Sequence, residues 1–373
     1  MKKQLLFCLL SGGLLIFSAC RNQKPFHRLT ENNPVPVFNT LFVRYEDLRS
    51  PKFAALKEKY RLDTIFHGET DEFKRILLLR HWINKTIPID NQGPYPGDNS
   101  AESTLDEALL GHGFHCGYFM LVQDAILNAY GYVTRCVLAD VGVPVDPVAG
   151  EGHHAVNEVW SNQFQKWFLS DAKYDYHFEK NGVPLSALEV RDEFLKNKAA
   201  DIQLMKGPDR VPTVTYPELK NRSKALFAQI YTWLSWAKYL DRYSGWPDCP
   251  SDTMYMYDDA YFKTHTWYYN GKPHWAYHTA FLNLVQDRKQ IEWTPNTLSA
   301  VVNISGGDQA QIHLRSNTPN FKTYQLRIIP DTNWRDIPDA IDLTLTSDRE
   351  EMVFRAMNLA LVAGPEFRLK FER

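Results

Sequence analysis

The spacing of apolar residues changes once in the first half of the chain, and this change restricts the fold more than any other feature. From Tyr45 to Lys85 and again from Cys116 to Tyr130, apolar residues recur every three or four positions, as in helices that bury one face. The next three runs, up to Asp171, are rich in β-branched and aromatic residues and predict strands: YVTRCVLA, HAVNEVW and WFLSD. Helices followed by antiparallel strands are typical of an α+β domain, which we assign to residues 41–200.

The second half of the chain divides at Pro295. Before this residue, the chain is dense in aromatic side chains and residues 217–243 return to helical spacing, so we expect an aromatic-rich helical extension over residues 201–295. After it, five short alternating runs separated by turn residues predict a small β-sandwich over residues 296–373.

The first 20 residues, MKKQLLFCLLSGGLLIFSAC, have the pattern of a secretory signal. Their ending resembles the lipobox of bacterial lipoproteins, which implies that residues 1–19 are removed and that Cys20 is lipidated. The polar, proline-containing stretch over residues 20–40 would then be a tether. An ordinary cleaved signal with an incidental cysteine is the alternative. Residues 21–24 hold no acidic cluster that would indicate export to the cell surface. We therefore expect a cell-envelope lipoprotein on the outer membrane, facing the periplasm.

The charge balance limits the partners. Removal of residues 1–19 leaves 40 basic and 44 acidic side chains, a net charge of −4. This balance argues against binding to nucleic acid and against electrostatic attraction to anionic lipid, so the membrane contact would rest on the lipid anchor. The sequence does not indicate an oligomeric state.

Three cysteines remain after Cys8 and Cys20 are set aside, and an odd number outside the cytoplasm leaves at least one thiol unpaired. Cys136 lies in the middle of an expected strand and is most simply part of the core. Cys249 lies in a turn-like segment, and a disulfide between it and Cys136 would leave Cys116 as the free thiol. Cys116 follows the loop GHGFHCG at the start of an expected helix, where N–H groups and the helix dipole lower the pKa of a thiol and can hold an oxyanion.

The following strands can supply a base and an acid for this thiol. If Trp160 pairs with Gln165 around a four-residue loop, the residue opposite His154 is Asp171. The carboxylate could then fix the tautomer of His154 and leave its other ring nitrogen for Cys116. A shift of one residue in the register would remove this pairing.

The order of Cys116, His154 and Asp171, within GFHCGYFMLVQDAILNAYGYVTRCV, HHAVNEVW and WFLSD, resembles the transglutaminase-like fold of the papain-like cysteine-enzyme superfamily. The resemblance covers about residues 70–180 and implies that Cys116 is the nucleophile, His154 the base and Asp171 its orienting acid. Four further positions match the family pattern: Arg135, Glu158, Val159 and Trp167. Four positions depart from it, and they bear on the substrate pocket: Phe119, Met120, Val156 and Ala172.

Each of these residues also has a structural interpretation. Alone, Cys116 would be a buried apolar residue, His154 a structural histidine and Asp171 a cap at a strand end, and only their joint occurrence favours a triad. A metal site is a further alternative, with ligands from five residues: His112, His115, Cys116, His153 and His154. Their spacing matches no standard zinc pattern, and adjacent strand residues point to opposite faces, so no metal or cofactor is expected.

The aromatic region bears on the substrate. Its irregular part suits the wall of a cleft, and we expect Trp267, Tyr268 and Trp275 to bind substrate there. Trp82 is a candidate oxyanion donor, although its helical position also suits the core. The sequence therefore favours a cysteine enzyme that acts on an amide of a protein, peptide or peptidoglycan-type substrate through an acyl-thioester, by hydrolysis more than by cross-linking. The alternative is a non-catalytic glycan- or protein-binding lipoprotein on the same scaffold.

Overall fold

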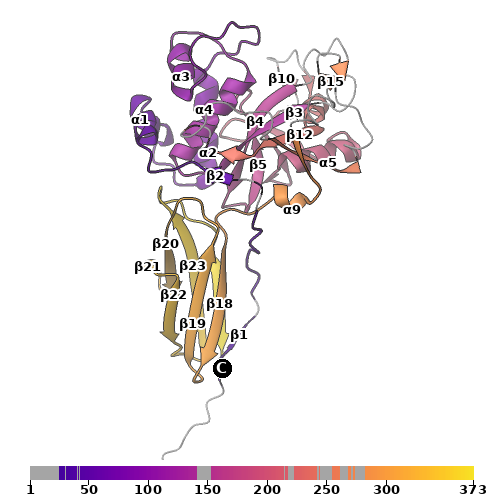
Figure 1. Cartoon of the computed structure of the whole chain (residues 1–373). Helices are drawn as coiled ribbons and strands as arrows, with labels where there is room; N and C mark the ends of the chain where they lie inside the picture. Colours follow the sequence, from indigo (N-terminus) through magenta and orange to yellow (C-terminus); the bar gives the residue numbers. More distant parts are fainter. Residues whose placement is uncertain are drawn as a thin grey trace, which may run out of the picture.

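The computed structural model describes residues 25–29, 31–39, 41, 43–140, 153–213, 215–216, 222–241, 243, 254–260, 268–269, 272–273 and 282–373. They form an α+β core that sits on one end of an elongated β-sandwich (Figure 1). The predicted α+β class and the predicted C-terminal β domain are confirmed.

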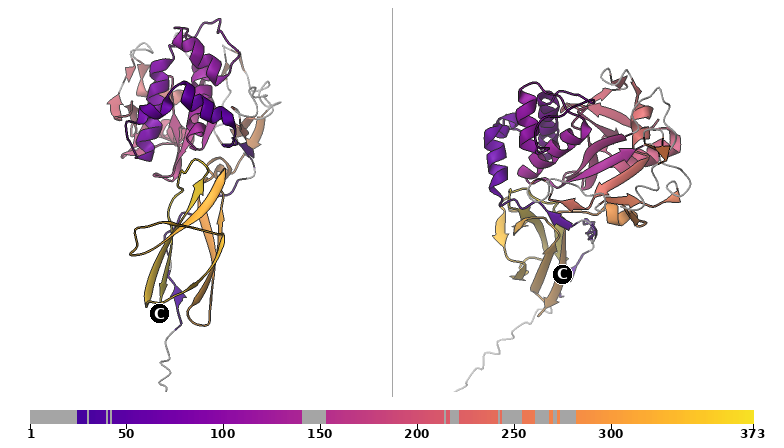
Figure 2. Two further views of the ribbon diagram at one scale, coloured as in Figure 1. Left: turned by 90° about the vertical axis from the view of Figure 1, so that its left-hand side faces the viewer. Right: turned by 45° about the horizontal axis from the view of Figure 1, so that its top comes forward.

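One layer of the core is helical and lies on one side of the central sheet (Figure 2). Its helices are α1 (Pro51–Lys59), the 3₁₀ helix η1 (Leu62–Phe66), α2 (Glu72–Thr86), α3 (Ala101–Leu109) and α4 (Cys116–Ala129). Helix α4 is buried along most of its length because α1, α2, α3 and the sheet all pack against it. Gly131 follows it with φ +75°, the left-handed conformation that commonly ends helices. A Cβ on Gly131 would lie 2.5 Å from Cβ of Ala360, so only glycine admits this loop of the sandwich.

The central sheet has six strands in the order β17-β14-β12-β3-β4-β5. The strands are β3 (Thr134–Asp140), β4 (His153–Ser161), β5 (Lys166–Ser170), β12 (Trp233–Ala237), β14 (Met254–Tyr257) and β17 (Leu282–Val285). Neighbouring strands are antiparallel except β14 and β17, which are parallel. The sheet therefore takes strands from both sides of residue 200.

The helical expectation for residues 217–243 is only partly met. Helix α6 (Lys224–Ile230) lies in this range, but Trp233–Ala237 forms the strand β12, which pairs with β3 and β14. The expectation is wrong for this segment because Trp233 and Trp236 are spaced as on a helix, while aromatic residues also favour strands. Pairing with β3 places both tryptophans in the core.

The other elements of the core are short. A four-stranded sheet has the order β7-β6-β8-β9, made of β6 (Tyr176–Lys180), β7 (Val183–Pro184), β8 (Gln203–Lys206) and β9 (Val211–Thr213), and helix α5 (Ala187–Asn197) lies between β7 and β8 in the chain. Three two-stranded pairs complete it: β2 (Val43–Tyr45) with β13 (Tyr239–Leu240), β10 (Thr215–Tyr216) with β11 (Arg222–Ser223), and β15 (Tyr268–Tyr269) with β16 (Lys272–Pro273).

The sandwich consists of two sheets with a shared apolar interior. One has the order β1-β24-β23-β20-β21 and the other β18-β19-β22. Their strands are β1 (His27–Arg28), β18 (Leu298–Ser305), β19 (Gln309–Ser316), β20 (Phe321–Ile328), β21 (Arg335–Ile337), β22 (Ala340–Thr344), β23 (Arg349–Asn358) and β24 (Phe367–Glu372). In β19, Ala310, Ile312 and Leu314 are buried while the residues between them are exposed, the alternation that predicted a strand with one buried face.

The segment expected to be a tether is instead docked on the sandwich over its described part. Phe26 is buried in the interior of the sandwich, and β1 pairs with β24. Further along, Asn33 exchanges hydrogen bonds of 2.7 Å with the backbone of Arg368. The tether prediction is wrong for residues 25–29, because Phe26 fills the apolar interior and β1 extends a sheet. It is also wrong for residues 31–39, because Asn33 is bonded to Arg368 and the Val37 N–H donates to Thr294 Oγ1 at 2.8 Å.

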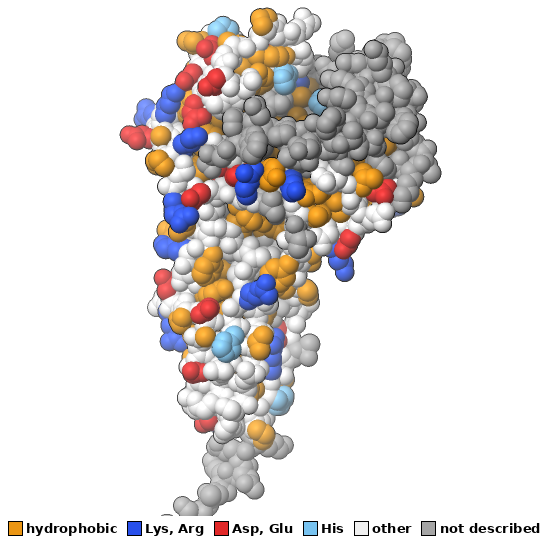
Figure 3. Space-filling model, in the orientation of Figure 1, with side chains coloured by type: hydrophobic (Ala, Val, Ile, Leu, Met, Phe, Trp, Pro, Cys, Tyr) orange, Lys and Arg blue, Asp and Glu red, His pale blue; other side chains and the backbone are white. Residues whose placement is uncertain are grey.

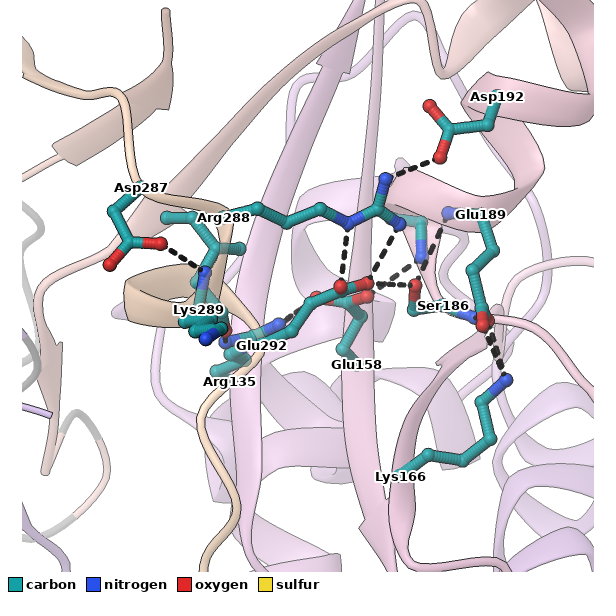
Figure 4. A network of polar contacts seen from close by, with 12 residues as sticks. Arg135, Glu158, Lys166, Ser186, Glu189, Asp192, Asp287, Arg288, Lys289 and Glu292 are labelled. Carbon is teal, nitrogen blue, oxygen red and sulfur yellow. Dashed lines mark hydrogen bonds and ion pairs between the residues drawn. The ribbon is translucent and has the colours of Figure 1, made fainter. Parts of the chain in front are cut away.

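A buried ion pair within the central sheet also contacts the segment that leads into the sandwich (Figure 4). Arg135 Nη2 lies 2.7 Å from Glu158 Oε2, and Glu158 also accepts hydrogen bonds from Trp236 Nε1 at 2.6 Å and from the Ala187 N–H at 2.7 Å. Arg135 also donates to the Ile291 carbonyl in α9 (Arg288–Ile291). Both charged groups are therefore compensated, on the face of the sheet opposite to Cys136.

Charged side chains of both signs are mixed over the described surface on the face drawn in Figure 3. Such a mixture gives no large field of one sign on the described part of that face. None of the described helices is long and apolar enough to cross a membrane.

Candidate active site

The start of α4 is fixed by the loop before it, which packs closely against the loop after α2. Cys116 is the first residue of the helix, and His115 caps it: His115 Nδ1 accepts a 3.0 Å hydrogen bond from the Gly117 N–H. The preceding Phe114 donates its N–H to the Pro88 carbonyl at 2.9 Å. A Cβ on Gly113 would lie 2.7 Å from Cβ of Asp90, so this glycine is required for the two loops to meet.

The structure brings His154 and Asp171 together, although not by the predicted register. His154 lies on β4, and its Nε2 is 2.6 Å from Asp171 Oδ2. Trp160 pairs with Trp167 and not with Gln165, so the β4–β5 ladder would place residue 173 opposite His154. The register prediction is wrong because the hairpin continues to Ser161 and Lys166, with Gln165 turning at φ +52°.

Asp171 reaches His154 because it leaves the ladder in a tight turn. The backbones of Asp171 and Tyr176 exchange hydrogen bonds of 3.0 and 3.1 Å, and Asp171 Oδ1 accepts one of 3.2 Å from the Tyr174 N–H. The other carboxylate oxygen is left for the imidazole. The turn itself therefore orients Asp171.

Three side chains of α2 hold this turn from outside. Arg80 Nε and His81 Nδ1 lie 2.9 and 2.6 Å from the two carboxylate oxygens of Asp175. Asn84 Nδ2 donates to the Lys173 carbonyl at 2.8 Å. Arg80 and Asp175 are both buried, so the turn is anchored by a charge pair with little access to water.

Helix α4 is also tied to the strands by a buried amide. Gln123 Nε2 donates to Asn157 Oδ1 at 3.1 Å and to the Ser170 carbonyl at 3.0 Å. Gln123 lies seven residues after Cys116, two helical turns along the same side. These bonds set the distance between the helix that carries Cys116 and the strands that lead to His154 and Asp171.

The surroundings of Cys116 favour its thiolate. Burial raises the pKa of the thiol, but hydrogen bonds from His115 and His154 and the positive charges of His154 and Lys173 outweigh this effect and hold the pKa well below its usual value. Position at a helix N-terminus acts in the same direction. Cys116 is a free cysteine, partly exposed to solvent.

The surroundings of His154 favour its protonated form. Burial lowers the pKa of this imidazole, but the Asp171 carboxylate and the Cys116 thiolate raise it to about 9. Because Nε2 faces Asp171, Nδ1 is the ring nitrogen left for Cys116. At neutral pH the two shifts together favour a thiolate–imidazolium pair.

A hollow of about 310 Å³ lies next to the turn that follows Asp171. Its walls come from the end of α2, the loop after it and the turn that follows Asp171: Asn84, Lys85, Ile87, Pro88, Ile89, Lys173 and Tyr174. The ring of Tyr174 lies 5.5 Å from the imidazole of His154, centroid to centroid. Tyr174 thus contacts both the hollow and the imidazole.

The comparison with known proteins agrees with this geometry. Residues 60–172 match the family model of the transglutaminase-like superfamily, and this range contains Cys116, His154 and Asp171. Residues 60–172 form a transglutaminase-like domain. No curated protein matches the chain in sequence. One matching solved structure is a protein of Cytophaga hutchinsonii that is provisionally named a cysteine protease; it is 16% identical, the match covers 46% of this chain and 50% of that protein, and the TM-score is 0.27.

The other predicted site residues of the transglutaminase-like domain have different positions. Trp82 is half-buried and packs against the helical core, and its oxyanion role stays a prediction. His112 lies 2.7 Å from Glu107, and His153 lies 3.0 Å from Asp140. Among the residues that the structure describes, no three or more His, Cys, Asp or Glu side chains are arranged to hold a metal ion.

The predicted substrate-binding and lipidation residues cannot be placed by side chain. Cys20, Trp267 and Trp275 lie outside the described residues, as does Cys249. Tyr268 lies in β15, with only its backbone described.

Three functional candidates were missed by the sequence interpretation. Gln123 could have been noticed as an amide within the apolar run of α4. Lys173 and Tyr174 follow the predicted acid by two and three residues, but only the turn geometry shows that they lie near the site.

Proposed function

We propose that the transglutaminase-like domain is a cysteine enzyme that acts on an amide through an acyl-thioester. Cys116 would be the nucleophile, His154 the general acid and base, and Asp171 the group that orients His154. The observation that supports the proposal most is the 2.6 Å contact between His154 Nε2 and Asp171 Oδ2, in a domain whose helix α4 begins at Cys116.

In the first half-reaction, the Cys116 thiolate attacks the carbonyl carbon of the amide and forms a C–S bond. In this proposal the backbone N–H of Cys116, at the N-terminus of α4, stabilises the resulting oxyanion. Nδ1 of the protonated His154 then gives its proton to the leaving nitrogen, the C–N bond breaks, and an amine departs. The products are an acyl-thioester on Cys116 and a neutral His154.

In the second half-reaction, neutral His154 takes a proton from water, whose oxygen attacks the thioester carbon. The C–S bond breaks, a carboxylic acid leaves, and the thiolate–imidazolium pair is restored. A primary amine in place of water would give a new amide and hence cross-linking. We propose hydrolysis as the main outcome and protein, peptide or peptidoglycan-type amides as substrates.

We also propose that the protein is a lipoprotein anchored through Cys20 and facing the periplasm. Cys20 precedes the buried Phe26 by six residues. Strand β1 lies near the end of the sandwich that is remote from the core (Figure 1). An anchor at Cys20 would therefore hold the sandwich between the membrane and the transglutaminase-like domain.

The test is a turnover experiment in H₂¹⁸O with a broad peptide mixture. We expect new carboxyl groups labelled with ¹⁸O in the presence of the protein, and none with the Cys116→Ala or His154→Ala variant. A parallel sample with a fluorescent primary amine would report cross-linking. Equal products from the parent protein and Cys116→Ala would contradict the proposal, as would the absence of products in both samples.

A further inference from the structure

Lys173 is a buried cation, and no Asp or Glu carboxylate among the described residues forms an ion pair with it. Only 1% of the residue is exposed, and its Nζ donates to Asn91 Oδ1 at 2.7 Å and lies 5.0 Å from the centroid of the Tyr174 ring. Neither neighbour carries a negative charge. Burial of an ammonium group costs free energy unless an opposite charge or several hydrogen bonds compensate it. One amide oxygen and one aromatic ring compensate Lys173 only in part, so an anion bound here would be stabilised.

This cation is close enough to Cys116 to act on its thiol, and it lines a hollow. Lys173 lines the hollow together with Tyr174, whose ring lies 5.5 Å from the imidazole of His154, and the charge of Lys173 acts on the Cys116 thiol. The amide of Asn84 and the exposed Lys85 line the same hollow, while Ile87, Pro88 and Ile89 supply an apolar wall. Two cationic groups and an amide donor beside apolar surface fit a short aliphatic chain that ends in a carboxylate.

We propose that this hollow binds a carboxylate of the acyl donor, with Lys173 as the residue that pairs with it. The inference rests on the proposed function and narrows its substrate class to amides that carry a carboxylate close to the scissile carbonyl, such as those next to an acidic side chain or a free chain end. Lys173 enters as a binding and specificity residue, and no bond to it is made or broken.

The test compares a charged alkylating agent with its neutral isostere, iodoacetate with iodoacetamide, on the full-length protein. Both react with the thiolate of Cys116, so their rate ratio cancels any change in the thiolate fraction. We expect Lys173→Met to lower the ratio of the iodoacetate rate to the iodoacetamide rate by roughly fivefold, the factor for one ion pair partly open to water. Lys173→Arg should retain the ratio, and Lys85→Met is the matched control at the exposed rim, with a smaller change.

A second experiment measures whether a carboxylate occupies the hollow, without using a charged alkylating agent. At constant ionic strength, succinate should protect Cys116 from iodoacetamide better than succinamide does, and Lys173→Met should remove the difference. A ratio unchanged in Lys173→Met, or equal protection by the two compounds, would overturn the inference even if the pH midpoint of alkylation moves, because Lys173 would then act only on the thiol. Failure of the proposed function has a separate signature: Cys116 would react with iodoacetamide no faster than an ordinary thiol.

Discussion

The charge pair behind the Asp171 turn offers a sharp test of how the site is held. Arg80 Nε lies 2.9 Å from Asp175 Oδ1, and both side chains are at most 1% exposed. Asp175 has φ +57°, a conformation that asparagine also tolerates, so Asp175→Asn removes the charge while it retains the shape of the turn. Breaking one side of a buried pair leaves the other charge uncompensated, which costs about 3–5 kcal/mol.

The assay is urea unfolding of Asp175→Asn followed by tryptophan fluorescence, which reports mainly the core because nine of the ten tryptophans precede Pro295. The matched control is Asp106→Asn, which breaks a pair with Lys59 in which both side chains are 48% exposed and which should cost at most about 1 kcal/mol. Alkylation of Cys116 by iodoacetamide should also have a higher pH midpoint in the variant than in the parent, because a loosened turn no longer fixes His154. A loss below about 1 kcal/mol with an unchanged midpoint would refute the reasoning.

Three further predictions concern the amide link, the pH dependence of stability and the docked N-terminal segment. Gln123→Leu removes two hydrogen bonds between α4 and the strands; it should cost about 1–3 kcal/mol in urea unfolding and slow alkylation of Cys116, and an unchanged rate would count against this role. Burial, aided by the charge of Arg80, lowers the pKa of His177 to about 4, so the unfolded state binds a proton first as the pH falls; unfolding free energy should drop by about 3 kcal/mol between pH 6.5 and 4, and a flat profile would contradict the shift. Phe26→Ala should lower the hydrogen-exchange protection of β24 by about 3–5 kcal/mol, whereas Phe38→Ala, at a half-exposed residue, should leave it nearly unchanged.

The sequence predicted the parts of the fold that depend on local pattern. The helix that begins at Cys116 and ends before Gly131 was predicted because its apolar spacing and terminal glycine are local signals. The alternation of the C-terminal strands predicted a sandwich for the same reason. Trp233–Ala237 was misassigned because aromatic residues fit both periods, and pairing with β3 decided between them.

The sequence predicted which residues lie in the site better than it predicted how they are brought together. Cys116, His154 and Asp171 were chosen from their order and local context, and the structure brings His154 and Asp171 within 2.6 Å by a different register from the one expected. The ion pair between Arg80 and Asp175 joins residues 95 positions apart, and no local sequence pattern could predict it. The same holds for the hollow beside Lys173, whose walls come from two separate segments.

The central claim is that Cys116 and His154 form a thiolate–imidazolium pair, and the pH dependence of Cys116 alkylation tests it most directly. Rates should be measured with iodoacetamide on the parent protein and on His154→Ala, with modification of Cys116 read by peptide mass spectrometry. The parent should react at a pH well below about 8.5, the usual midpoint of a thiol, with a second change near pH 9 where His154 loses its proton. His154→Ala should move the midpoint upward to that usual value or beyond, and the same midpoint in both proteins would contradict the pair.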